Sequence, residues 1–252
     1  PGSADREAMV DEQLQERGIQ LVLLPTPVKP VVHPEKYDRA GAKAVGPVRN
    51  ASFDPFVREM AEAGVLVLDP APELFRAGRE EPQYLPGDTH WRPEGMQKTA
   101  AALAELITDN ELLSADRGAG YERGEAQVLE YGDLVDLLDI PEDYAIFEPT
   151  EVTIQPVTGA GGTRWQADPN AEVLLLGDSF SNIFSLGAMG WGESAGLAEQ
   201  LSYELQRPVD RIVRNADGAE ATRRILSREL AAGRDRLAGK KAVVWQFASR
   251  EL

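Results

Sequence analysis

The sequence contains no cysteine, which excludes disulfide bonds, thiolate metal sites and cysteine nucleophiles. Histidine is scarce as well, with His33 and His90 as the two examples in 252 residues. No apolar run approaches the roughly 20 residues that a membrane-spanning helix needs. Basic residues are in the minority, with 26 against 42 acidic ones, and the net charge is −16. We therefore expect no nucleic-acid partner, because phosphate binding needs a basic surface.

The length and composition are those of a globular protein, with 42% hydrophobic residues. We expect a single domain over residues 1–252, with an acidic insertion at about 110–170. Between Asp109 and Glu151 there are 13 acidic residues and two arginines. Residues 207–236 contain eight arginines and five acidic residues, and they are either solvated helix faces or the border of a site for an anionic ligand.

Short apolar runs alternate with amphipathic stretches along most of the chain. The runs predict strands, and the stretches predict helices. Strands are expected at 19–24, 65–69, 151–157, 172–177, 209–213 and 241–247, and helices at 4–17, 52–63 (with Ser52 as N-cap), 96–107, 133–138, 193–206 and 219–232. This alternation indicates an α/β fold with a mainly parallel sheet and helices on its faces.

Three prolines, Pro25, Pro27 and Pro30, follow the first predicted strand. Proline fixes φ and restricts the residue before it, so this segment is expected to be an extended, non-helical loop. Lys29 and His33 lie on it, and we expect His33 to be a surface residue.

Ser179 lies where the buried strand 172–177 ends and small polar residues begin. A serine at such a strand-to-helix corner is exposed at the sheet edge, and free helix N–H groups point toward it. This suits a nucleophile, because the attacked carbonyl becomes an oxyanion that these groups can stabilise. The alternative is a capped helix without chemistry.

Asp88 and His90 lie just before the helix that begins near Pro93. A serine nucleophile needs a base and a group that orients the base. Residues i and i+2 of an extended loop point the same way, so Asp88 can reach one ring nitrogen of His90 and leave the other for Ser179. The alternative is a loop histidine hydrogen-bonded to its neighbour without chemistry.

Asn215 follows the predicted strand 209–213. Its side-chain amide could stabilise an oxyanion together with the backbone N–H of Ser179, or it could be a turn residue near Gly218. A metal site built from Asp88, His90 and Asp178 is disfavoured, because it lacks a second histidine. We expect neither a metal nor a cofactor.

Gly177-Asp178-Ser179 resembles the first sequence block of the SGNH (GDSL-like) hydrolase superfamily. With the loop Val28-Lys29-Pro30, residues 87–91 (Gly-Asp-Thr-His-Trp) and the closing stretch 245–252, the pattern resembles the SGNH-hydrolase-like O-acetyltransferases of bacterial exopolysaccharide secretion, of the periplasmic alginate O-acetyltransferase type. Ordinary SGNH hydrolases place the serine first, whereas here Asp-x-His precedes it, as in this permuted acetyltransferase family. The resemblance implies a three-layer SGNH-hydrolase-like fold with a circularly permuted motif order.

The resemblance also implies an activity, the transfer of an acetyl group through a Ser179 acyl-enzyme onto hydroxyls of an exopolysaccharide, either alginate-like or neutral. Asp88 and His90 complete the catalytic triad in this scheme, and Lys29 and Arg214 are candidate substrate contacts. The implied acetyl donor is a membrane-bound O-acyltransferase, and other exopolysaccharide secretion proteins are further partners.

The implied location is the periplasm. Pro1, Gly2 and Ser3 are typical of a cloning remnant, so an inner-membrane anchor on a preceding N-terminal segment is expected. Two alternatives stay open: an SGNH acetylesterase that removes acetyl groups from polysaccharide, and a non-catalytic polysaccharide-binding member of the export machinery.

Overall fold

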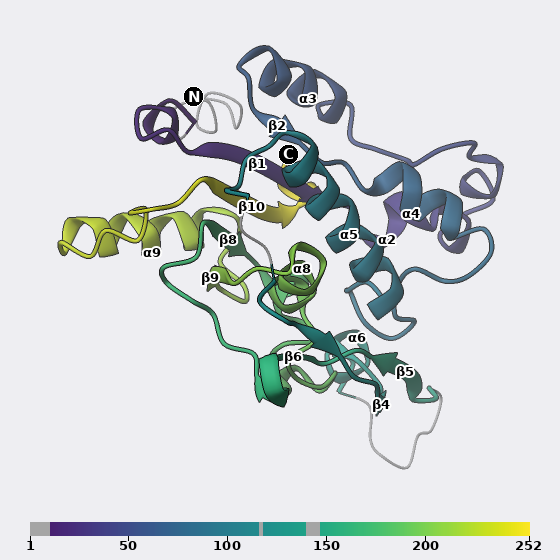
Figure 1. Ribbon diagram of the computed structural model, residues 1–252. Coiled ribbons are helices and arrows are strands. Elements are labelled where there is room, and N and C mark those ends of the chain that lie inside the picture. Colours follow the sequence, from purple (N-terminus) through teal and green to yellow (C-terminus); the bar gives the residue numbers. More distant parts are fainter. Residues whose placement is uncertain (1–10, 116–117, 140–146) are drawn as a thin grey trace.

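A five-stranded parallel sheet forms the centre of the molecule (Figure 1). The structure is a computed structural model that describes residues 11–115, 118–139 and 147–252. Its strands run in the order β2-β1-β10-β8-β9, with bounds β1 (Gln20–Thr26), β2 (Leu66–Val67), β8 (Val173–Gly177), β9 (Val209–Val213) and β10 (Ala242–Ala248). All four neighbouring pairs are parallel, which confirms the predicted fold class.

Helices connect these strands and cover both faces of the sheet. They are α2 (Lys29–Val32), α3 (Phe53–Glu62), α4 (Ala71–Ala77), α5 (Pro93–Asp109), α6 (Asp133–Asp136), α7 (Ser179–Asn182), α8 (Leu197–Leu205) and α9 (Glu220–Ala231). Among the described residues, no helix has both the length and the apolar character needed to cross a membrane.

Successive residues of the central strands face opposite sides of the sheet, which creates two apolar cores. In β1, Leu23 belongs to one cluster with Met60 of α3, and α9 contributes to the same cluster. The next residue, Leu24, belongs to the other cluster with Leu103 of α5 and Leu201 of α8. The sheet is therefore the middle of three layers, with α3 and α9 on one face and α5 and α8 on the other.

The described residues between 110 and 170 include two small antiparallel sheets beside α8 (lower part of Figure 1). Their strands are β3 (Glu122–Arg123), β4 (Ala126–Glu130), β5 (Thr150–Ile154), β6 (Val157–Gly159) and β7 (Thr163–Arg164). Ile154, Val157 and Trp165 pack into the same apolar cluster as α5 and α8. This shared core is consistent with an insertion within a single domain, which stays a prediction.

The proline-rich segment after β1 differs from the sequence prediction. It includes a short helix, α2, with Pro30 in the first turn, where proline is tolerated because the N–H has no partner there. His33 is not at the surface but 5% exposed. Its Nε2 accepts the Gln83 N–H at 3.0 Å, and its ring packs edge-on against Tyr84. Burial lowers the pKa of His33.

Three further predicted elements differ from the structure in bounds or contacts, or lie partly outside the described residues. The single strand predicted over 151–157 is split into β5 and β6 at Pro156, whose missing N–H interrupts pairing. Ser52 precedes α3 but makes no capping bond, because its hydroxyl donates to the Leu252 carbonyl. Of the helix predicted over 4–17, residues 4–10 lie outside the described residues, and 11–15 are helical.

Candidate active site

Ser179 stands at the corner between β8 and α7, at the carboxyl edge of the central sheet. Asp178 caps α7 by accepting the Phe180 N–H at 2.8 Å. Gly177 permits the close turn, because a Cβ there would lie 2.3 Å from the Ser181 hydroxyl oxygen. The backbone N–H of Ser179 thus belongs to the first turn of a helix, where N–H groups lack an intrahelical partner.

Gln246 of β10 holds this corner from the neighbouring strand. Its side-chain oxygen accepts the Asp178 N–H at 2.9 Å and the Ser181 hydroxyl at 2.7 Å, and its amide donates to Thr26 of β1 at 3.1 Å. The Ala248 N–H donates to the second carboxylate oxygen of Asp178 at 3.1 Å. Burial raises the pKa of Asp178. Strands β10 and β1 therefore fix the position of the serine corner.

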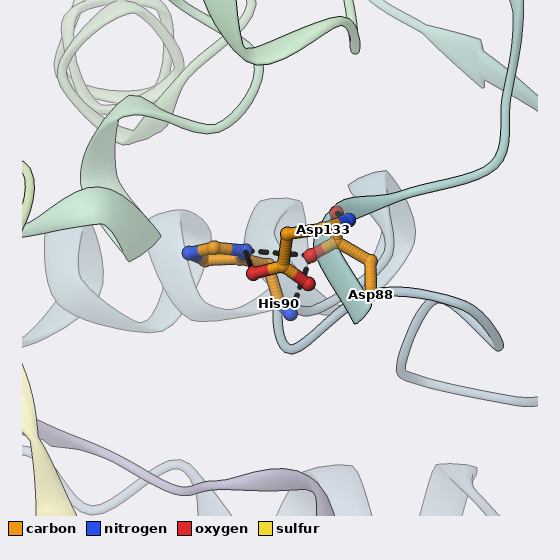
Figure 2. A group of neighbouring side chains, drawn as sticks. All are labelled: Asp88, His90 and Asp133. Carbon is orange, nitrogen blue, oxygen red and sulfur yellow. Dashed lines mark hydrogen bonds and ion pairs between the residues drawn. The ribbon is translucent and has the colours of Figure 1, made fainter. Parts of the chain in front are cut away.

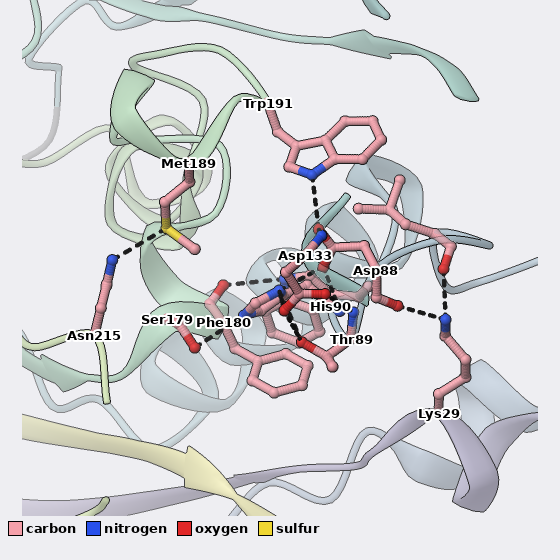
Figure 3. Close-up of polar contacts among 12 residues, drawn as sticks. Lys29, Asp88, Thr89, His90, Asp133, Ser179, Phe180, Met189, Trp191 and Asn215 are labelled. Carbon is pink, nitrogen blue, oxygen red and sulfur yellow. Dashed lines mark hydrogen bonds and ion pairs between the residues drawn. The ribbon is translucent and has the colours of Figure 1, made fainter. Parts of the chain in front are cut away.

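The side chains of Ser179, His90 and Asp88 form one hydrogen-bonded row (Figure 3). His90 Nε2 lies 2.8 Å from Ser179 Oγ, and Nδ1 lies 2.6 Å from Asp88 Oδ1. Both Asp88 and His90 are buried, and they come from a segment about 90 residues before the serine. A hydroxyl, an imidazole and a carboxylate in this order are the parts needed for nucleophilic acyl transfer.

Four N–H donors surround the carboxylate of Asp88. Oδ1 accepts the backbone N–H of His90 at 2.9 Å as well as the ring N–H, and Oδ2 accepts the Trp191 indole at 2.8 Å and the Asp133 backbone at 3.1 Å. Burial alone would raise the pKa of Asp88, but the bonds and charge of His90 and the backbone N–H groups lower it to about 2. The carboxylate therefore stays ionised and holds one tautomer of His90.

Aromatic side chains set the plane of the His90 ring. The Phe180 ring lies 4.9 Å from it, centroid to centroid. The neighbouring Trp91 is fully buried, and its indole N–H donates to the Phe180 carbonyl at 3.0 Å. The loop before α5 is thus tied directly to α7, which limits the movement of His90 relative to Ser179.

Lys29, a predicted substrate contact, donates hydrogen bonds to backbone carbonyls of its own chain. Its Nζ donates to the backbone carbonyls of Leu85 at 2.6 Å and Pro86 at 3.2 Å, and to that of Asp88 (Figure 3). Burial lowers the pKa of Lys29, although Asp88 and Asp133 act in the opposite direction. In this structure the ammonium group fixes the loop that carries His90, and a contact to substrate stays a prediction.

Asn215 and Arg214 follow β9 at the same edge of the sheet. The Asn215 side-chain oxygen accepts the Asn182 amide at 3.0 Å, and its nitrogen faces Met189 Sδ at 3.3 Å. Arg214 is exposed and pairs with Asp217 at 3.3 Å. The oxyanion role of Asn215 and the substrate role of Arg214 stay predictions.

Asp133 of α6 lies beside the row as a second carboxylate (Figure 2). Its two oxygens accept the Thr89 N–H at 2.8 Å and the Thr89 hydroxyl at 2.6 Å. Oδ2 also lies 3.8 Å from His90 Nδ1. The ligand atoms of Asp88, His90 and Asp133 lie within 4.8 Å of one another, a spacing that a metal ion could use.

The donors around these carboxylates fit hydrogen bonding better than metal binding. Asp88 accepts four N–H groups, and Asp133 accepts two bonds from Thr89. A bound cation would have to displace them. Asp178, the ligand considered from the sequence, is occupied as the cap of α7.

Residues 3–249 match the ALGX family, described as an SGNH hydrolase-like domain of the acetyltransferase AlgX. The chain belongs to this family. The probable alginate O-acetylase AlgJ of Pseudomonas putida is 28% identical over 179 residues, which are 68% of this chain and 46% of that protein. The alginate biosynthesis protein AlgX of Pseudomonas aeruginosa is 30% identical over 115 residues, 42% of this chain and 22% of that protein. The chain thus spans about half the length of the AlgJ relative.

Solved structures show the same fold. The O-acetyltransferase domain of Pseudomonas putida AlgJ superimposes with a TM-score of 0.73 at 21% identity, over 99% of this chain and 85% of that one. PatB1 of Bacillus cereus superimposes with a TM-score of 0.56 at 12% identity, over 99% of this chain and 88% of the PatB1 chain. The SGNH-hydrolase-like fold predicted from the motifs is therefore confirmed for this ALGX-family chain.

Sequence reasoning missed three residues of this ALGX-family site: Asp133, Trp191 and Gln246. Gln246 lies within the closing stretch 245–252, which carried part of the resemblance. It is a polar residue in an otherwise apolar strand, and this was the one sign in the sequence that it has a structural role. Asp133 and Trp191 lie 45 and 103 residues after Asp88. No local pattern connects them to it.

Proposed function

We propose that this chain is a serine-dependent O-acetyltransferase that moves an acetyl group onto hydroxyls of a bacterial exopolysaccharide. The observation that carries the proposal is the contact of Ser179 Oγ with His90 Nε2 at 2.8 Å, with His90 held in turn by Asp88. Membership in the ALGX family supports acetyl transfer over other acyl chemistry.

In the first half-reaction, His90 removes the proton of Ser179 while Oγ attacks the carbonyl carbon of an acetyl ester or thioester. The negative charge moves to the carbonyl oxygen, where the Ser179 N–H stabilises it together with the amide of Asn215. Because the thioether of Met189 is a weak acceptor, that amide can turn to an oxyanion at little cost. The donor's alkoxide or thiolate leaves with the proton from His90, and Ser179 stays acetylated.

In the second half-reaction, a sugar hydroxyl takes the place of the leaving group. His90 removes its proton as the hydroxyl oxygen attacks the acetyl-serine, and the proton then returns to Ser179 Oγ as the ester bond to serine breaks. The net result is one acetyl ester on the sugar and free enzyme. Attack by water instead would release acetate, which is the esterase alternative.

The names of the relatives support an alginate-like acceptor, and a neutral polysaccharide is the other possibility. By analogy with the family, we propose that a membrane-bound O-acyltransferase supplies the acetyl group, that other secretion proteins are partners and that the reaction takes place in the periplasm.

The test is the intact-protein mass after brief exposure to a chromogenic acetate ester. We expect one acetyl adduct on the parent and none on Ser179→Ala, with Ser227→Ala, an exposed serine of α9, as the matched control that behaves like the parent. Mannuronate oligosaccharides and neutral oligosaccharides are then added separately.

Faster loss of the adduct with one oligosaccharide, together with acetylated sugar, establishes the transferase and identifies the acceptor class. Loss to water alone, unaffected by any sugar, would favour the acetylesterase. Saccharide binding by both parent and Ser179→Ala, without an adduct on either, would favour the non-catalytic binding protein.

A further inference from the structure

The first turn of α6 packs against the loop that carries Asp88 and His90. The two backbones approach so closely that a Cβ on Gly132 would lie 2.7 Å from Asp88 Cβ. A Cβ on Gly87 would lie 2.2 Å from the Tyr131 carbonyl oxygen. The Leu134 N–H also donates to the Gly87 carbonyl at 3.1 Å. Glycine at 87 and 132 therefore allows a contact that side chains would prevent.

Asp133 connects these two segments through three hydrogen bonds. Its backbone N–H donates to Asp88 Oδ2, and its carboxylate accepts both donors of Thr89. Thr89 Oγ1 also lies 3.2 Å from His90 Nδ1. Asp133, which lies in α6 outside the central sheet, thus holds Thr89, the residue between Asp88 and His90.

We propose that Asp133 is a positioning residue for acetyl transfer. It holds the loop so that His90 faces Ser179, and its charge stabilises the imidazolium that forms when His90 takes a proton. This inference rests on the proposed function, because it needs His90 to be the base.

Four charged groups surround His90, and they differ in how they are placed. Asp88 is hydrogen-bonded directly to the His90 ring. Asp178, at the N-terminus of α7, is buried and interacts electrostatically with His90. Lys29 lies on the far side of the loop, where burial lowers its pKa and the charges of Asp88 and Asp133 oppose that shift. The side chain of Asp133 is 41% exposed, so water screens its charge and its electrostatic effect on His90 is moderate.

The sign of the pH effect follows from the charge. A carboxylate near His90 favours the protonated ring, which cannot act as a base. Removing that charge in Asp133→Asn should move the acid-side midpoint of activity to lower pH, by about half a pH unit. The loss of positioning should lower kcat about tenfold, since small displacements of catalytic groups are costly.

The experiment compares pH profiles of acetate-ester turnover for the full chain and its variants. Asp133→Asn is expected to show both changes. Asp133→Glu should return the midpoint because it restores the charge, and should recover part of kcat because a carboxylate can again accept both Thr89 donors. Asp136→Asn, an exposed residue on the same helix, is the matched control and should resemble the parent. Equal rates and midpoints for Asp133→Asn and the parent, with Ser179→Ala inactive, would overturn the inference and leave the proposed function standing.

The variant Thr89→Val separates the effect of loop positioning from the effect of the Asp133 charge. It also provides the test if Asp133→Asn does not fold. It removes the hydroxyl bond and keeps the Asp133 charge, so kcat should fall while the acid-side midpoint stays in place. A Thr89→Val variant with the parent's kcat would count against positioning through this bond. Activity retained in Ser179→Ala would overturn the proposed function, and this inference with it.

Discussion

In the proposed mechanism, Ser179 is the nucleophile, His90 is the base and Asp88 orients the base, in line with their hydrogen-bonded contacts. Ser179→Ala and His90→Ala should each abolish turnover of a chromogenic acetate ester. Asp88→Asn keeps the shape but not the charge, and should lower kcat by about 10³–10⁴-fold because it favours the wrong tautomer of His90. Circular dichroism should show intact folds, and parent-like turnover in Ser179→Ala or His90→Ala would contradict the assignment.

Asn215 offers a second test among single residues, because its amide nitrogen faces a weak acceptor, the Met189 thioether. If its amide stabilises the oxyanion, Asn215→Ala should lower kcat by about 10²–10³-fold with KM little changed. Asn182→Ala should cost less, since it frees the Asn215 side chain without removing it. Kinetics on the same ester measure both, and an unchanged kcat in Asn215→Ala would leave Asn215 a turn residue.

Among the elements, the joint between β8 and α7 leaves no room for a side chain at Gly177. Gly177→Ala would place a methyl group 2.3 Å from the Ser181 hydroxyl and 3.2 Å from the Gln246 side-chain oxygen. We expect a loss of stability of about 1–3 kcal/mol, with lower activity as α7 shifts. Urea unfolding measures this, and Gly46→Ala, which has open space for its Cβ, is the control. Equal unfolding midpoints for the two variants would show that the joint adapts freely.

Element positions were predictable where the hydrophobic pattern was strong and periodic. The apolar runs before Ser179 and at the end of the chain became β8 and β10, within one or two residues. The helix α2 was missed because Pro25, Pro27 and Pro30 suggested an extended path, although a proline in the first turn is compatible with a helix. His33 was placed at the surface for the same reason.

For the folded chain as a unit, Asp88 links stability to pH. Its pKa is about 2 in the folded protein against 3.8 as the ordinary value, so it contributes about 2 kcal/mol above pH 4. That contribution is lost as the pH falls through about 2, because a lowered carboxyl pKa stabilises the fold only while the group is ionised. The unfolding free energies of parent and Asp88→Asn should therefore converge between pH 4 and pH 2. A gap that stays constant over this range would contradict the linkage, and Asp136→Asn supplies the baseline.

Long-range pairing was what the sequence could not reveal. The order Asp88, His90, Ser179 could be recognised from two short motifs, each local in the chain. The supports of that row come from α6, from the loop that holds Trp191 and from β10, and nothing near those residues indicates which of them meet. Likewise, the positive charge of Lys29 suggested a contact to substrate. In the structure its ammonium group donates to backbone carbonyls of the loop before His90.

The strand order has a consequence for the newly made chain. Of the five strands of this sheet, β10 is the last in the sequence, yet it lies between β1 and β8, at the middle of the sheet. Until its residues have left the ribosome, β1 and β2 cannot join β8 and β9, and Ser179 lacks the support of Gln246. Folding from the N-terminal side, which is common during translation, can therefore complete neither the sheet nor the site. A chain stalled just before residue 242 should hold two separate strand pairs with exposed inner edges, and chaperones would meet it in that state.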